Sequence, residues 1–90
     1  MKLLHCTACL DVFNLPNNGN ERSCSCGLTK GRYLDGRNAV YSGEHAVPMG
    51  FSNEEFKIAV NSRNYKPRWF TDFGAFTIPD DSITFKREEK

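Results

Sequence analysis

The sequence has little net charge, and this limits the partners that it can attract as a whole. Twelve lysine and arginine residues oppose eleven aspartate and glutamate residues, so the 90-residue chain carries a formal net charge of +1 at pH 7. No field of one sign therefore draws the chain towards nucleic acid or an anionic membrane. Contacts of that kind require a local patch of charge.

The chain also lacks a long apolar run. No stretch approaches the roughly 20 apolar residues that a membrane-spanning helix needs, so we expect no contact with a membrane. The first residues imitate the start of a signal peptide, but His5 and Asp11 interrupt the apolar segment that an export signal requires. We therefore expect a cytoplasmic protein, where clustered cysteines bind metal more often than they form disulfides.

Catalytic motifs are missing as well. The sequence has no glycine loop for phosphate, and its two histidines, His5 and His45, are far apart and belong to no nucleophile motif. Asp80 and Asp81 follow a proline in a predicted turn, where aspartate is favoured for local hydrogen bonding. We expect a non-enzymatic protein, and a small metal- or thiol-dependent enzyme, with a site assembled across the fold, is the alternative.

The cysteines are concentrated near the N-terminus. All four cysteines lie in the first 26 residues, as Cys6-Thr7-Ala8-Cys9 and Cys24-Ser25-Cys26-Gly27. Two thiol pairs that can each bind one ion are what a tetrahedral four-cysteine zinc site requires, so we predict Cys6, Cys9, Cys24 and Cys26 as metal ligands. Four thiolates leave no open position for water or substrate, and the predicted Zn²⁺ is therefore structural.

The second cysteine pair is unusual, because a single residue separates its members where zinc ribbons have two or more. Gly27 follows at once and can adopt the left-handed conformation that lets a chain leave a metal-binding turn. His5 is a candidate substitute ligand, since imidazole also binds zinc. Two disulfides, an iron site and a redox-active thiol pair are the alternatives to zinc.

Turn residues recur at short intervals and predict a β-rich chain. The Asn-Gly pair in the loop at 16–20 predicts a hairpin between the two cysteine pairs. An Asp35-Gly36 turn predicts a second hairpin in the middle of the chain. The expected strands are 12–15, 32–34, 39–41, 46–47, 73–78 and 83–86.

One helix is predicted, over about 53–62. Ser52 can cap its first turn, and Glu55 stands at the position of the capping-box partner. Phe51 and Phe56 occupy the two positions of a hydrophobic staple. Apolar residues at helical spacing continue this pattern to Val60.

The N-terminal third resembles a zinc ribbon. The second cysteine pair and the chain after it look like small uncharacterised zinc-ribbon proteins of bacteria and phages. The residues that carry this resemblance are Gly31-Arg32-Tyr33, Tyr41, Pro48-Met49-Gly50-Phe51 and the predicted helix. The resemblance implies the same four cysteine ligands and a compact β-rich fold, and it implies no activity.

We therefore expect a small α+β, β-rich fold with zinc-ribbon-like N-terminal hairpins, a β-meander and one short helix. Residues 1–90 form a single zinc-stabilised domain in this prediction. Its zinc-binding part is 1–31, the meander with the helix is 32–86, and 87–90 is a solvated tail.

A basic and aromatic segment follows the predicted helix, and it is a candidate surface for a partner. Its residues are Arg63, Tyr65, Lys66, Arg68 and Trp69. Aromatic residues and arginine are frequent at the centres of protein interfaces, and we expect a protein partner for an accessory, regulatory or inhibitory factor. The same residue types can bind single-stranded nucleic acid, which is the alternative function. A purely structural role is the third reading, with Trp69 and Phe70 in the core.

Overall fold

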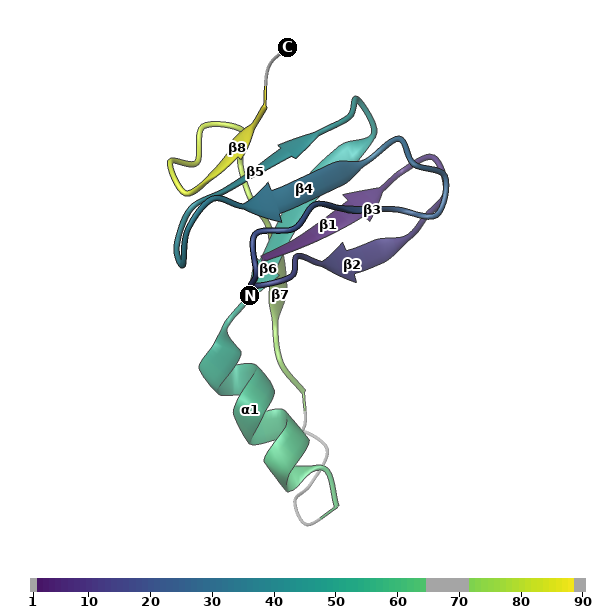
Figure 1. Ribbon diagram of the computed structural model, residues 1–90. Helices are drawn as coiled ribbons and strands as arrows, with labels where there is room; N and C mark the ends of the chain where they lie inside the picture. The colour runs from purple at the N-terminus through teal and green to yellow at the C-terminus, as the bar shows by residue number, and fades with distance from the viewer. Residues whose placement is uncertain (1, 65–71, 89–90) are drawn as a thin grey trace.

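The strands of the computed structural model, which describes residues 2–64 and 72–88, form two four-stranded sheets (Figure 1). The first sheet is fully antiparallel and has the order β2-β1-β6-β7; these strands are Val12–Asn14, Lys2–Cys6, Ala46–Phe51 and Ala75–Thr77. The second has the order β3-β4-β5-β8; these strands are Arg22–Ser23, Lys30–Tyr33, Ala39–Ser42 and Phe85–Arg87. Its pairs are antiparallel except β5 and β8, which run parallel.

This architecture confirms a small β-rich α+β fold. The antiparallel pairs β1–β2 and β3–β4 are the two N-terminal hairpins, and β3, β4 and β5 form a meander in chain order. The next strand, β6, leaves the meander and pairs with β1 in the other sheet. The prediction of a hairpin between the two cysteine pairs is wrong, because β2 and β3 lie in different sheets.

The turn between β5 and β6 carries the chain from one sheet to the other. Gly43 has a φ of +115°, and a Cβ atom at this position would lie 2.2 Å from the backbone oxygen of Leu28. Only glycine fits so close an approach to the β3–β4 connection. The turn between β5 and β6 therefore packs directly on the loop that carries the second cysteine pair.

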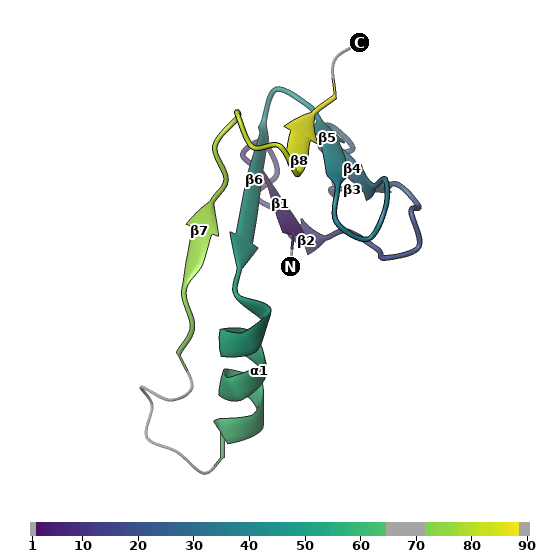
Figure 2. The ribbon, with the colours of Figure 1, turned by 90° about the vertical axis from the view of Figure 1, so that its left-hand side faces the viewer.

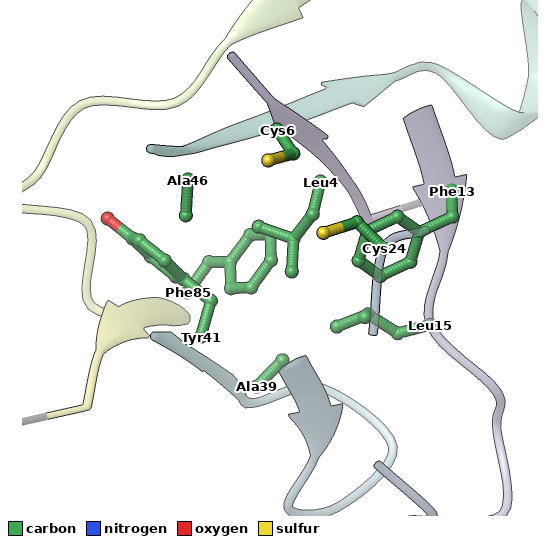
Figure 3. Packing of buried hydrophobic residues seen from close by; sticks show 9 residues of the cluster. All are labelled: Leu4, Cys6, Phe13, Leu15, Cys24, Ala39, Tyr41, Ala46 and Phe85. Carbon is green, nitrogen blue, oxygen red and sulfur yellow. The ribbon is translucent and has the colours of Figure 1, made fainter. Parts of the chain in front are cut away.

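The core lies where the two sheets meet (Figure 3). Leu4 and Phe13 come from the first sheet, and Tyr41 and Phe85, whose rings are 5.1 Å apart in an edge-on arrangement, come from the second. β4 approaches β1 closely at Gly31, where a Cβ atom would lie 2.6 Å from a methyl carbon of Leu4. Cys6 and Cys24 belong to the same buried cluster, so the core borders the cysteines directly.

The helix α1 (Asn53–Ser62) extends away from the two sheets, beside the approach to β7 (Figures 1 and 2). Its predicted start is confirmed, since the Glu55 amide donates to the Ser52 hydroxyl at 3.3 Å. The predicted staple is confirmed as well, with the rings of Phe51 and Phe56 5.0 Å apart and that of Phe73 within 5.3 Å of both. This aromatic cluster joins the helix to β6.

No helix within residues 2–64 and 72–88 is long and apolar enough to cross a membrane. The C-terminal end differs from the predicted tail at 87–90, because Arg87 is the last residue of β8. The amide of Glu88 donates to the Tyr41 carbonyl at 2.6 Å, and its carboxylate pairs with Arg32 at 2.9 Å. Residues 87 and 88 are thus part of the folded structure, and 89–90 lie outside the described residues.

Candidate metal centre

The four cysteines converge from two hairpins. Cys6 and Cys9 lie at the turn between β1 and β2, and Cys24 and Cys26 lie at the turn between β3 and β4. Their four Sγ atoms all lie within 4.8 Å of one another. Each sheet contributes one pair, so the cluster joins the two sheets at one end of the core.

The spacing of the sulfur atoms fits a metal ion at their centre. Sulfur atoms at the usual Zn–S distance of about 2.3 Å lie about 3.8 Å apart along the edges of a tetrahedron. The Sγ atom of Cys26 lies 3.7 Å from that of Cys6 and 3.4 Å from that of Cys24. All four thiols are free, with no disulfide among them. The cluster can therefore hold a metal ion in an all-sulfur shell.

The two cysteine turns are built alike. In the first, the Cys6 amide donates to the Asp11 carbonyl at 2.9 Å; in the second, the Cys24 amide donates to the Thr29 carbonyl at the same distance. Each bond joins two residues that are five positions apart. The missing residue between Cys24 and Cys26 is thus compensated by one more residue after Cys26, and the short spacing leaves the size of the turn unchanged.

A left-handed residue follows the second cysteine in each turn. Gly27 has a φ of +79°, as expected from its position, and its amide donates to the Cys24 carbonyl at 3.0 Å. Leu10 takes the same place in the first turn, with a φ of +66° and an amide that donates to the Cys6 carbonyl at 2.8 Å. A branched side chain is strained in this conformation, and Leu10 is nevertheless 72% exposed.

Asp11 ties the first turn to the second. One of its carboxylate oxygens accepts hydrogen bonds from the amide and the hydroxyl of Ser25, each at 3.0 Å. Ser25 is the single residue between Cys24 and Cys26. The short second pair is therefore held in place by a carboxylate from the first hairpin, in addition to its own backbone.

Hydrogen bonds to sulfur favour thiolates in the cluster. Burial would raise the pKa of Cys24, but the Thr29 amide, 3.3 Å from its sulfur, and the neighbouring thiols lower that pKa to about 6. The Thr29 side chain and the Cys9 amide lower the pKa of Cys6. The Leu28 amide favours the thiolate of Cys26 too, but the adjacent Cys24 and burial raise its pKa to about 12. A cation is the group that allows all four to be thiolates together.

Exposure differs across the cluster. Cys6 and Cys24 are buried, Cys9 is half-buried and Cys26 is exposed. The ion position is thus reached from the side of Cys26, whereas the core covers the opposite side. Four thiolates would complete a tetrahedral shell, and such a shell offers no position for a substrate.

His5 does not belong to the cluster. Leu4 and Cys6 face the core on β1, so the alternation of the strand turns His5 to the other face. Its Nδ1 atom lies 3.1 Å from the Asp11 carbonyl oxygen. His45 lies beside Thr7 and Glu44, at 3.3 Å and 3.4 Å. Among the described residues, the candidate ligands are therefore the four predicted cysteines alone.

The predicted partner segment lies mostly outside the described residues. Tyr65, Lys66, Arg68 and Trp69 fall in the range 65–71, which the structure does not describe. Arg63 is exposed at the end of α1, where its guanidinium donates to the Val60 carbonyl at 2.5 Å. This contact places a cation at the negative end of the helix dipole.

Sequence reasoning missed three residues of the centre: Leu10, Asp11 and Thr29. Their residue types carry no metal-site signal, since aspartate and threonine are common in any turn. The matched position of Asp11 and Thr29, each five residues after the first cysteine of a pair, is a signal that the sequence does contain.

Comparison of this chain with models of known protein families, with curated proteins and with solved structures found no match. The zinc-ribbon resemblance therefore depends on the cysteine spacing and on the two hairpins that present the cysteines.

Proposed function

We propose that this protein is a non-enzymatic module that a structural Zn²⁺ ion stabilises. The observation that carries the proposal is the convergence of four free thiols, two from each sheet, to within 4.8 Å. An all-sulfur tetrahedral shell suits zinc and iron, and zinc brings no redox chemistry that would need a second partner. Cys6, Cys9, Cys24 and Cys26 would hold the ion.

The ion would supply folding free energy. Zinc binding in small four-ligand domains is worth on the order of 10–16 kcal/mol at neutral pH, which equals or exceeds the whole stability of a typical domain. The buried core here is small: ten hydrophobic residues among those described. Since each sheet provides two ligands, the ion would hold the two sheets together at the end where Cys6 and Cys24 border the core.

Removal of the metal tests this role. We expect a strong chelator under reducing conditions to abolish the cooperative unfolding transition, and added Zn²⁺ to restore it. A reduced protein that unfolds at the same temperature with and without chelator would contradict a structural role. Replacement of Cys26 by serine should reproduce the loss, and Ser23→Ala, in the adjacent strand β3, is the matched control.

We further propose that the metal centre presents a surface to a protein partner, in an accessory or regulatory factor of a larger bacterial or phage assembly. Leu10 and Leu28 support this. Leu10 follows Cys9 directly and Leu28 lies one residue further along, after Gly27; they are 72% and 55% exposed. Leu10 also retains a strained conformation that glycine would adopt freely, which is typical of a residue kept for a contact.

Variants of the two leucines test the surface. Leu10→Asn removes the first apolar side chain and introduces a residue that tolerates the left-handed conformation. Leu28→Ser removes the second apolar side chain. We expect each to reduce the recovery of one specific protein partner from cell extract at least tenfold while zinc is retained. Leu34→Ser, at an exposed leucine between β4 and β5, is the matched control. Equal recovery by all three variants would contradict this surface.

Binding of single-stranded nucleic acid is the alternative function, with Arg63, Tyr65, Lys66, Arg68 and Trp69 as its residues. Such binding weakens steeply with salt, because contacts to phosphates release counterions. A titration of the protein with single-stranded oligonucleotides at several salt concentrations separates the two functions. Salt-sensitive binding that Arg68→Ala and Trp69→Ala abolish would favour nucleic acid, and no binding at low salt would remove this alternative.

A further inference from the structure

The strand β7 forms an open edge of the first sheet. Figure 2 shows it beside β6 at the margin of the molecule. It pairs with β6 on one side, and no residue within 2–64 and 72–88 pairs with it on the other. All three of its side chains are exposed. The unpaired peptide groups of such an edge are a template for a further strand.

The hydrogen bonds to β6 indicate which peptide groups of β7 face this edge. The Ile78 amide, one residue past the strand, donates to the Pro48 carbonyl at 2.8 Å. Hydrogen-bonding groups alternate between the two sides of an antiparallel strand, so the peptide groups of Phe76 face β6 as well. Those of Ala75 and Thr77 therefore point to the open edge, where each residue offers one N–H and one C=O group.

This edge is complementary to a second copy of itself. When two copies of β7 run antiparallel around a twofold axis at Phe76, Ala75 of each copy lies opposite Thr77 of the other. Every outward N–H and C=O group of these two residues then has a partner across the axis. The two Phe76 residues face each other in the closer kind of antiparallel pair, which has no hydrogen bonds of its own.

The side chains favour the same pairing. Phe76 is 56% exposed, and aromatic residues directly opposite each other stabilise an antiparallel pair. Phe76 and Ile78 also line an open, mostly apolar cavity of about 330 Å³, so the surface beside the edge is apolar. No charged residue lies between Asp72 and Asp80, whereas edge strands are commonly protected by charges. Nothing in the strand itself therefore repels a second copy.

The open edge lies away from the metal centre. β6 pairs with Cys6 at Ala46, and it pairs with β7 at its other end, over Met49–Phe51. A contact through β7 therefore does not involve the cysteine turns, and it is separate from the surface of Leu10 and Leu28.

On these observations, we propose that the protein forms a twofold dimer through β7, in which the first sheets of two copies join into one continuous sheet. The contact is short, because each copy contributes a strand of three residues. Its area is small, so the association is weak and depends on protein concentration. This dimer goes beyond the proposed function, since it does not depend on which partner the metal centre binds.

Analytical ultracentrifugation of the reduced protein with Zn²⁺ present measures the association. We expect a reversible equilibrium of monomer and dimer at concentrations up to about 1 mM. Thr77→Pro removes an N–H group that points to the open edge, a position where edge strands tolerate proline. We expect it to weaken the dimer at least about tenfold, because each copy loses one hydrogen-bond donor across the axis. Thr77→Val keeps the amide; as the matched control, it should dimerise like the unchanged protein.

A pair of charge variants tests the register. In Phe76→Lys and in Phe76→Glu, like charges face each other across the axis, so we expect each variant alone to be monomeric at the same concentrations. An equimolar mixture places lysine opposite glutamate and should form dimers. In any other register residue 76 does not face itself, and mixing the variants would not restore association. That result would overturn the proposed pairing.

Two other outcomes would also overturn the proposal. An unchanged protein that stays monomeric at about 1 mM would leave the edge of β7 to a strand of another protein. Dimers that form equally well with Thr77→Pro and with Phe76→Lys would use a different surface. Should Thr77→Pro fail to fold, the two Phe76 variants and their mixture decide, because Phe76 is largely exposed and its replacement leaves the backbone pairing with β6 in place.

Discussion

The carboxylate of Asp11 should contribute measurably to metal binding, although it is not a ligand. It holds Ser25 through two hydrogen bonds of 3.0 Å and so fixes the residue between Cys24 and Cys26. The backbone contacts of Asp11 do not depend on its side chain, and Asp11→Ala removes these two bonds alone. Because Ser25 is exposed, water replaces part of the loss, and we estimate about 1–2 kcal/mol for both bonds together.

That free energy corresponds to metal binding about 5- to 30-fold weaker in Asp11→Ala, since about 1.4 kcal/mol is a factor of ten. The measurement is competition for Zn²⁺ between the reduced protein and a chelator of known affinity. Ser25→Ala should lose a smaller part, because it removes only the bond from the hydroxyl. The double variant should be no worse than Asp11→Ala, since both changes affect the same contact.

A competing electrostatic effect has the opposite sign. Four thiolates around a divalent cation carry a net charge of −2, and the nearby Asp11 carboxylate repels them. Asp11→Asn removes the charge and keeps an oxygen acceptor for Ser25. If the hydrogen bonds dominate, this variant binds metal far better than Asp11→Ala. If both variants bind metal more tightly than the unchanged protein, repulsion dominates and our interpretation of Asp11 is refuted.

Three further predictions address the fold and the protonation of the site. Gly43→Ala should lower the free energy of unfolding by about 3 kcal/mol, since a Cβ atom there meets the Leu28 carbonyl oxygen and φ is +115°; a change below about 1 kcal/mol in denaturant unfolding would contradict this. Phe56→Ala should reduce the helical circular dichroism signal, because it breaks the contact with Phe51 and Phe73. The zinc affinity should stay unchanged, because the helix lies away from the metal centre (Figure 1). A loss of zinc affinity in this variant would contradict the prediction and show that the helix and the metal centre are coupled. The apparent zinc affinity should fall as pH decreases, and it should fall more steeply below pH 6. The pKa of Cys24 is lowered to about 6, so below this pH Cys24 must also lose a proton before it binds the ion. A constant slope of the logarithm of the affinity against pH, from pH 8 to pH 5, would contradict this prediction.

Local features of the chain could be predicted from its sequence. The helix at 53–62 follows from a cap formed by residues three positions apart and a staple formed by residues five positions apart, and both contacts are present. The four cysteines were likewise predictable, because their spacing alone restricts them to two short turns. In both cases the signal lies within a few residues of chain: in the cap and staple of the helix, and in the spacing within each cysteine pair.

The pairing of strands could not be predicted in the same way. The Asn-Gly loop at 16–20 predicted that its flanking strands pair with each other, yet β2 joins β1 and β3 joins β4. The reason is that Phe13 and Leu15 bury themselves in a core shared by both sheets, where Leu4 meets Gly31. Burial across the sheets outweighs the local turn preference, and no short-range pattern records it.

The contacts that support the cysteines were hidden for a related reason. Asp11 bonds Ser25, and this contact joins two hairpins that are distant in sequence. The single residue between Cys24 and Cys26 looked like a weakness of the predicted site. The structure shows instead a turn of normal length with outside support.

X-ray absorption at the zinc edge, on reduced protein purified without added metal, tests the metal centre most directly. One zinc ion per chain with four sulfur neighbours at about 2.3 Å is the predicted result. A shell that contains nitrogen or oxygen, or a folded protein with two disulfides and no zinc, would contradict a four-cysteine structural zinc site.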